Sequence, residues 1–179
     1  MSIRDAQSRY NLNRLTGGLA DITTFNRIVE NAGLKPDVSK RIQAGILLAG
    51  SLESVDEMSA FGVTVAEIEA LSGLVTVLPG DASVNLNTAE PRLVRALISN
   101  PAAASRFLAL REQDGMISSA TLGQIGIVAP IGTGVRTDYL EVQVDVTVGG
   151  AHVSLASLIT RSPKGVKSTA DVIRRQFGN

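Results

Sequence analysis

The stretch Ser83-Val84-Asn85-Leu86-Asn87-Thr88-Ala89-Glu90 decides the fold of this chain. Its apolar residues first alternate with polar neighbours, which predicts an extended arrival. Asn87 or Thr88 is then expected to cap a helix, because a short polar side chain can accept hydrogen bonds from the free amides of the first turn. Glu90 follows Asn87 at the spacing of a capping box. The stretch therefore predicts an extended segment that leads directly into a helix.

Two short helices are expected next. Leu93 and Leu97 recur at helical spacing, and Asn100-Pro101 closes that helix and opens a second one. Phe107 and Arg111 recur on one face of the second helix. Two short helices with a tight joint are typical of a helical hairpin.

The order of these motifs, continued to Leu122-Gly123-Gln124-Ile125-Gly126, resembles two protein classes. One is the helix-hairpin-helix domain of DNA-uptake proteins, and the other is the general secretion pathway protein K family of type II secretion minor pseudopilins. A DNA-binding hairpin needs a Gly-hydrophobic-Gly turn whose backbone amides reach a phosphate. Here the turn reads Ile98-Ser99-Asn100-Pro101, without glycine and with one amide removed by proline. The sequence therefore favours the pseudopilin family, with a helix-hairpin-helix DNA-binding module as the alternative.

A second match separates the two classes. Asp5-Ala6-Gln7-Ser8-Arg9-Tyr10-Asn11-Leu12-Asn13-Arg14-Leu15 is similar to a segment that the protein K family carries after its first strand. The resemblance implies an α+β fold, with a pilin-like antiparallel sheet (1–16 and 136–179) and a large inserted helical domain (17–135). That insertion would contain the helix-hairpin-helix-like (SAM-like) unit.

The resemblance also implies a function without catalysis. The chain would be a subunit at the tip of the type II secretion pseudopilus, where it caps the assembly and binds minor pseudopilins I and J, with H below them. It would lie on the periplasmic face of the bacterial inner membrane as a soluble truncation, attached only through an N-terminal helix that precedes Met1 in the family. Neither an enzymatic activity nor a nucleic-acid partner is expected.

The first half of the chain predicts an extended segment over 2–15 and a series of capped helices. Asp21 or Thr23 is expected to cap a helix that ends near Gly33, and Pro36 opens the next. Ser54 to Glu57 and Thr64 to Glu67 both have capping-box spacing, so each should begin a short helix.

The last part of the chain predicts a sheet. Residues 137–148 alternate strictly, with five aliphatic residues on one face. Gly149-Gly150 suits a two-residue hairpin turn, and residues 151–160 return as the partner strand. Residues 168–177 fit a helix by spacing and a strand by resemblance, so both alternatives stay open.

The composition limits both the class of protein and the partners that can be expected. The chain has 179 residues, 44% of them hydrophobic, so it can bury a core. Lys plus Arg and Asp plus Glu both number 17, and this zero balance argues against a nucleic-acid partner, which usually meets a basic surplus. The lack of cysteine excludes disulfides and thiolate chemistry. No apolar run reaches the ~18 residues of a membrane span.

Candidate chemistry is sparse. His152, the single histidine, is expected at the surface beside a hairpin turn, and the serines lack a histidine partner at a readable spacing. Glu53, Asp56 and Glu57 are calcium candidates, because calcium needs only oxygen ligands, although capping of a helix explains the same residues. Longer acidic loops hold calcium in the family, and their ligands do not transfer to the shorter region here.

Two Asn-Leu-Asn tracts are expected to be structural rather than catalytic. They comprise Asn11, Leu12 and Asn13, and Asn85, Leu86 and Asn87 with Thr88. The flanks of the tracts differ too much to predict an internal repeat.

Overall fold

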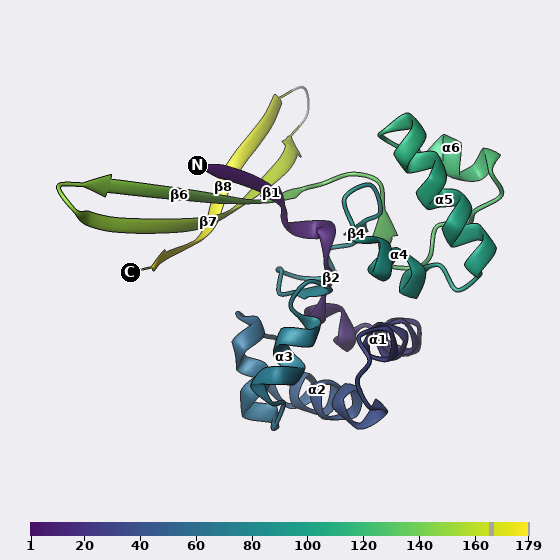
Figure 1. Cartoon of the computed structure of the whole chain (residues 1–179), viewed down its shortest axis with the longest axis horizontal. Coiled ribbons are helices and arrows are strands. Elements are labelled where there is room, and N and C mark those ends of the chain that lie inside the picture. The colour runs from purple at the N-terminus through teal and green to yellow at the C-terminus, as the bar shows by residue number, and fades with distance from the viewer. Residues whose placement is uncertain (165–166, 179) are drawn as a thin grey trace. The chain divides into compact units, whose positions relative to one another are not determined.

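The computed structural model of the chain describes residues 1–164 and 167–178. It divides into two compact units, Met1–Gln7 with Arg136–Asn179, and Ser8–Val135 (Figure 1). Strands make up nearly all of the first unit, and helices dominate the second. None of the helices in the described ranges is long and apolar enough to cross a bilayer. The chain is therefore α+β, with the helical unit inserted into the sequence of the sheet unit.

The sheet unit is a four-stranded antiparallel sheet in the order β1-β6-β7-β8. Its strands are β1 (Ser2–Asp5), β6 (Tyr139–Val148), β7 (Ala151–Lys164) and β8 (Lys167–Gly178). The hairpin between β6 and β7 turns at Gly149 and Gly150, whose φ angles of 57° and 86° are open to glycine. The tail is a strand, not a helix.

The chain enters the helical unit through η1 (Ala6–Ser8), and the first half of that unit follows. A two-residue strand, β2 (Tyr10–Asn11), pairs in parallel with β3 (Val75–Thr76). Between them lie η2 (Leu12–Thr16), α1 (Leu19–Asn31), α2 (Pro36–Ala49), η3 (Val55–Phe61) and α3 (Val65–Leu71). The segment 2–15, expected to be extended, is thus broken by two 3-10 turns.

The second half repeats this plan. The strand β4 (Val84–Asn85) pairs in parallel with β5 (Thr133–Gly134). Between them lie α4 (Pro91–Leu97), α5 (Pro101–Asp114) and α6 (Ser119–Gln124). The helix α1 packs against both α2 and α4, so it joins the halves.

One apolar core runs through both halves of the helical unit. Its largest fully buried side chains include Tyr10, Phe25, Ile42, Leu93 and Phe107. The rings of Tyr10 and Phe25 stack with their centroids 6.0 Å apart. The sequence-based division assigned 1–16 to the sheet, but the structure places the residues from Ser8 onward in the helical unit.

The helix caps agree with the sequence in part. Ser54 with Glu57, and Thr64 with Glu67, form complete capping boxes, as predicted. Asn100 caps α5 by accepting from the amides of the first turn.

Two predicted caps are wrong. The N-cap of α1 is Gly18, without a side-chain bond, because both predicted caps lie inside the helix: Asp21 binds Arg14, and Thr23 donates to the carbonyl of Leu19. The N-cap of α4 is Glu90, so this helix begins too late for Asn87 or Thr88 to cap it.

Candidate interaction surfaces

The first Asn-Leu-Asn tract holds three segments of the chain together. Asn13 Nδ2 donates to the carbonyls of Leu52 and Leu78, both at 3.0 Å, and its Oδ1 accepts from the Leu52 amide at 2.8 Å. Asn11 Oδ1 accepts from the amides of Asn13 (3.2 Å) and Leu78 (2.9 Å). Leu12 between them is fully buried. The asparagine side chains therefore provide hydrogen-bond partners for backbone groups of Leu52 and Leu78, which lie in loops.

The second tract does the same work in the second half. Asn87 Nδ2 donates to the carbonyls of Ile117 (3.0 Å) and Val135 (3.1 Å), and its Oδ1 accepts from the Ile117 amide (2.9 Å). Asn85 Oδ1 accepts from the Asn87 amide at 3.1 Å, and Leu86 is fully buried. Thr88 Oγ1 donates back to the Asn85 carbonyl at 3.3 Å.

The two halves thus share one local arrangement around their tracts, although the numbers of elements between their paired strands differ. In each half, the backbone segment that the second asparagine binds comes directly after a helix. Each of these helices ends at a glycine with positive φ, Gly50 at 79° and Gly115 at 80°. The second asparagine of each tract then binds the residue two positions beyond that glycine, Leu52 or Ile117.

Arg111, which ends the predicted hairpin, also serves the second tract. Its Nη1 donates to the carbonyls of Leu86 (2.8 Å) and Ala89 (2.6 Å), and burial lowers the pKa of this guanidinium. The arginine therefore satisfies carbonyls that the turn before α4 leaves without backbone partners.

Sequence reasoning missed a buried polar network beside the first tract. Arg14 Nε lies 2.9 Å from Asp21 Oδ1, with both side chains 9% exposed, and Tyr10 Oη donates to the same oxygen at 3.1 Å. Burial, followed by the charge of Asp21, raises the pKa of the Tyr10 phenol. Arg14 also donates to the Asp81 carbonyl.

Of the calcium candidates Glu53, Asp56 and Glu57, the last two use their carboxylates in the cap of η3, and Glu53 contributes its backbone amide. Glu57 Oε1 accepts from the amides of Ser54 (2.6 Å) and Glu53 (2.9 Å), while Asp56 Oδ2 accepts from Ser54 Oγ at 3.4 Å. Within residues 1–164 and 167–178, no three His, Asp or Glu side chains gather as ligands for a metal ion. A cation at this place would have to displace the cap.

His152 lies exposed near the β6–β7 turn, where its Nδ1 is 3.3 Å from Thr147 Oγ1. Asn100 Oδ1 accepts from the amides of Ala102 (3.0 Å) and Ala103 (3.1 Å). The amides that a DNA-binding hairpin would offer to a phosphate are therefore already taken by this side chain.

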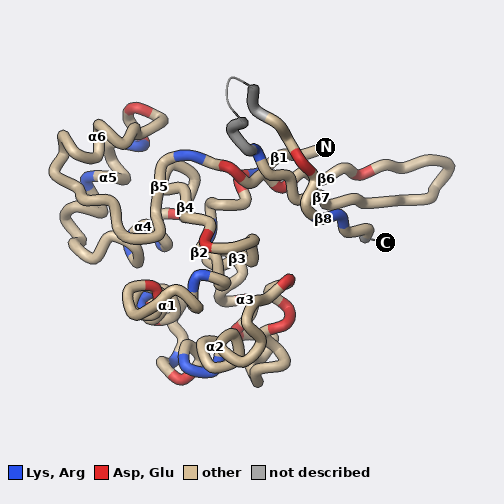
Figure 2. Tube along the Cα trace, turned by 180° about the vertical axis from the view of Figure 1, so that it is seen from behind, with Lys and Arg blue, Asp and Glu red and all other residues tan. Residues whose placement is uncertain are grey.

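The sheet unit carries a broad aliphatic face. The strand registers place eleven apolar side chains on it: Ile3, Leu140, Val142, Val144, Val146, Val148, Val153, Leu155, Ile159, Val172 and Phe177. None of them is fully buried, and Val146 and Val153, which face each other across the hairpin, are 49% and 50% exposed. Between residues 142 and 160 only Asp145 is charged, and the strand register places it on the opposite face. Figure 2 shows how few charged residues lie along the outer part of the β6–β7 hairpin. We call this surface the aliphatic face.

These features define a class of fold: an α+β chain with a pilin-like antiparallel sheet and a helical insertion. The chain is similar to a chain in the crystal structure of the GspK–GspI–GspJ complex of the enterotoxigenic Escherichia coli type 2 secretion system. The match has a TM-score of 0.69 and 19% sequence identity, and covers 99% of this chain and 79% of that one. At this identity the likeness shows the fold, which is pseudopilin-like. No family model and no curated protein matches the sequence.

Proposed function

We propose that this chain is a structural subunit at the tip of a type II secretion pseudopilus. It would cap the pseudopilus on the periplasmic face of the inner membrane, bind minor pseudopilins of the I and J kinds with H below them, and so support protein export. The fold likeness supports this proposal, because the similar chain belongs to a complex of three such proteins.

The observation that carries the proposal is the aliphatic face. Eleven apolar side chains lie on one side of a four-stranded sheet, interrupted there by Ser157 and Arg175 and, at the β1 edge, by Asp5. A stable soluble monomer would normally cover an apolar surface of this breadth. The near absence of charge between residues 142 and 160 of the β6–β7 hairpin is typical of the centre of a protein interface. In the proposed assembly, apolar helices of the pseudopilus pack on this face.

The test is reconstitution with partners. We would mix the chain with the periplasmic domains of minor pseudopilins I and J from the same operon, helices included, and measure mass by size exclusion with light scattering. A stable one-to-one-to-one complex is expected. If no complex forms at protein concentrations well above the dissociation constants of stable assemblies, the proposal is overturned.

A matched pair of variants tests the surface. Val146→Asp places a charge on the aliphatic face, whereas Thr147→Asp places the same charge one residue away on the opposite face. We expect the first to weaken the complex at least tenfold and the second to leave it unchanged. Equal effects of the two variants would show that the aliphatic face is not the contact.

A further inference from the structure

The helical unit contains a groove that neither the tracts nor the aliphatic face involves. Its walls are the N-terminal half of α1, the turn between α4 and α5 with the first turns of α5, and the loop Gly126–Ile131 after α6. Its volume is about 860 Å³. Three segments far apart in sequence thus meet around one open hollow.

The groove is apolar where it is exposed. Leu19 on α1, and Val128 and Ile131 on the loop, line it and are 78%, 90% and 70% exposed. Aliphatic side chains with this exposure, gathered at one groove, are typical of a surface that receives apolar groups of a partner.

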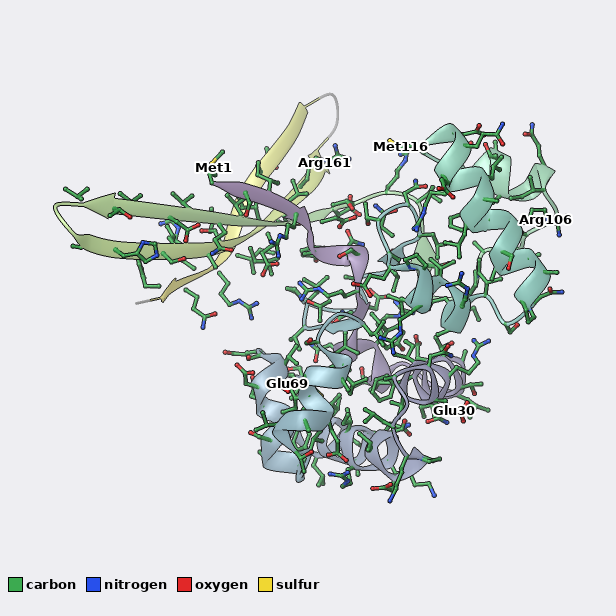
Figure 3. All side chains as sticks on the ribbon, in the orientation of Figure 1. Met1, Glu30, Glu69, Arg106, Met116 and Arg161 are labelled. Carbon is green, nitrogen blue, oxygen red and sulfur yellow. The ribbon has the colours of Figure 1, made fainter. Side chains whose placement is uncertain are left out.

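The charge in the groove has one sign. Arg27 of α1 and Arg106 of α5 both line it, and none of the described residues that line it is Asp or Glu. Figure 3 labels Arg106 on α5. The whole chain has no net charge, so this local excess of two positive charges is not a general property of its surface.

Arg27 lacks good acceptors of its own. Among the described residues, its Nε is the buried side-chain atom for which no hydrogen-bond partner lies within reach. Its Nη2 makes two long bonds, 3.4 Å to Thr24 Oγ1 and 3.5 Å to the Leu97 carbonyl. A guanidinium offers a planar fork of donors that matches a carboxylate, so an incoming carboxylate would give Nη2 a stronger acceptor than its two long bonds provide.

We propose that this groove binds a peptide segment of a partner protein that combines aliphatic side chains with a carboxylate. The aliphatic side chains pack against Leu19, Val128 and Ile131, and Arg27 and Arg106 hold the carboxylate. The aliphatic contacts and the ion pair support each other. Aliphatic side chains packed on the apolar walls exclude water from the groove, and the lower local dielectric strengthens the attraction between the carboxylate and the two arginines. This proposal is independent of a place in a pseudopilus.

The test uses peptide mixtures as probes. One mixture contains N-acetylated, C-amidated heptapeptides of Leu, Val and Ala around a central Asp, and the matched mixture carries Asn at that position, so the Asp side chain is the only carboxylate in either mixture. Binding to the ¹⁵N-labelled chain is followed by NMR, with the side-chain Nε–H signal of Arg27 as the direct reporter. We expect the Asp mixture to shift this signal and the amides of Ser99 and Val128, and to bind at least tenfold more tightly than the Asn mixture.

Variants separate charge from general packing. Arg27→Gln or Arg106→Gln should reduce the preference for Asp over Asn at least fivefold, while Arg95→Gln, an exposed arginine outside the groove, should leave it unchanged. Arg106→Gln keeps the test decisive if Arg27→Gln unfolds the chain. Equal binding of the two mixtures, shifts outside the groove, or no binding would overturn the proposal. Inorganic phosphate or duplex DNA that shifts the Arg27 signal as far would overturn it in favour of an anion site.

Discussion

Asn13 offers the sharpest test of how the inserted unit is held together. Asn13→Ala removes three buried hydrogen bonds, of 2.8, 3.0 and 3.0 Å, and leaves the Leu52 amide and two carbonyls without that partner. A typical hydrogen bond contributes about 1 kcal/mol net, and an unsatisfied buried donor costs a further 1 kcal/mol or more. We therefore expect the free energy of unfolding to fall by about 3–4 kcal/mol, and Tm to fall by roughly 10 °C.

The assay is thermal and urea unfolding followed by circular dichroism at the helical signal, which reports on the inserted unit. Two controls, both expected to lose less stability, set the scale for the result. Asn87→Ala removes the equivalent bonds at a half-buried site, so about 2 kcal/mol is expected. Asn31→Ala removes one exposed bond and should change stability by less than about 0.5 kcal/mol. If Asn13→Ala melts within about 2 °C of the wild type, or no lower than Asn31→Ala, the bracing role is refuted.

Three other perturbations follow from single contacts. Gly45→Ala places a Cβ against the ring of Phe61, so it should cost about 2 kcal/mol of unfolding free energy. In a Phe61→Ala background only helix propensity remains, and the same change should be neutral or stabilising. If urea melts show Gly45→Ala to be destabilising in both backgrounds, this explanation is wrong. Asp21→Asn leaves the buried Arg14 guanidinium without its counter-charge and should cost about 3 kcal/mol, more than a double Arg14→Met, Asp21→Leu variant. Equal losses in the single and double variants would show that the cost comes from loss of the pair itself and not from an uncompensated buried charge. The Thr64 amide and then Arg41 lower the pKa of Glu67, so this carboxylate contributes stability above its unfolded pKa and loses it as pH falls through the folded value. Melts from pH 7 to pH 3 should therefore be flatter for Glu67→Gln, and parallel curves would argue against the contribution.

The sequence predicts local features of this fold well. The capping boxes at Ser54 and Thr64, the Asn100 cap and the Gly149-Gly150 turn all depend on residues within a few positions of one another. The strict alternation of 137–148 reads correctly as a strand because its pairing has no irregularity.

The misjudged features depend on partners that are distant in sequence. Asp21 has the character of a helix cap, but its partner Arg14 comes from the preceding 3-10 turn. Asn87 suits a cap as well, but it binds Ile117 and Val135, thirty and forty-eight residues away. In such cases the tertiary partner outweighs the local preference.

The tail and the groove show two further limits. The pairing of β8 with β7 shifts register at Leu158 and Ile159, so Ile173 is an additional residue, and the alternation that marks a strand is interrupted. The groove is formed by three segments, and no short pattern in any of them contains the pairing of apolar walls with Arg27 and Arg106.

The connection between the two units constrains the order of folding. Gln7 Oε1 accepts from the amides of Asp138 (2.5 Å) and Tyr139 (3.2 Å), and β1 pairs directly with β6, so the chain leaves and re-enters the sheet side by side. Closing an unstructured loop of about 130 residues costs about 3 kcal/mol more entropy than closing one of about 4 residues. If Ser8–Val135 folds first, its two ends are already close together when β6 is synthesised, and the pairing of β1 with β6 no longer carries this loop-closure entropy. During synthesis, then, β1 waits unpaired until the insertion is complete, and the sheet assembles last.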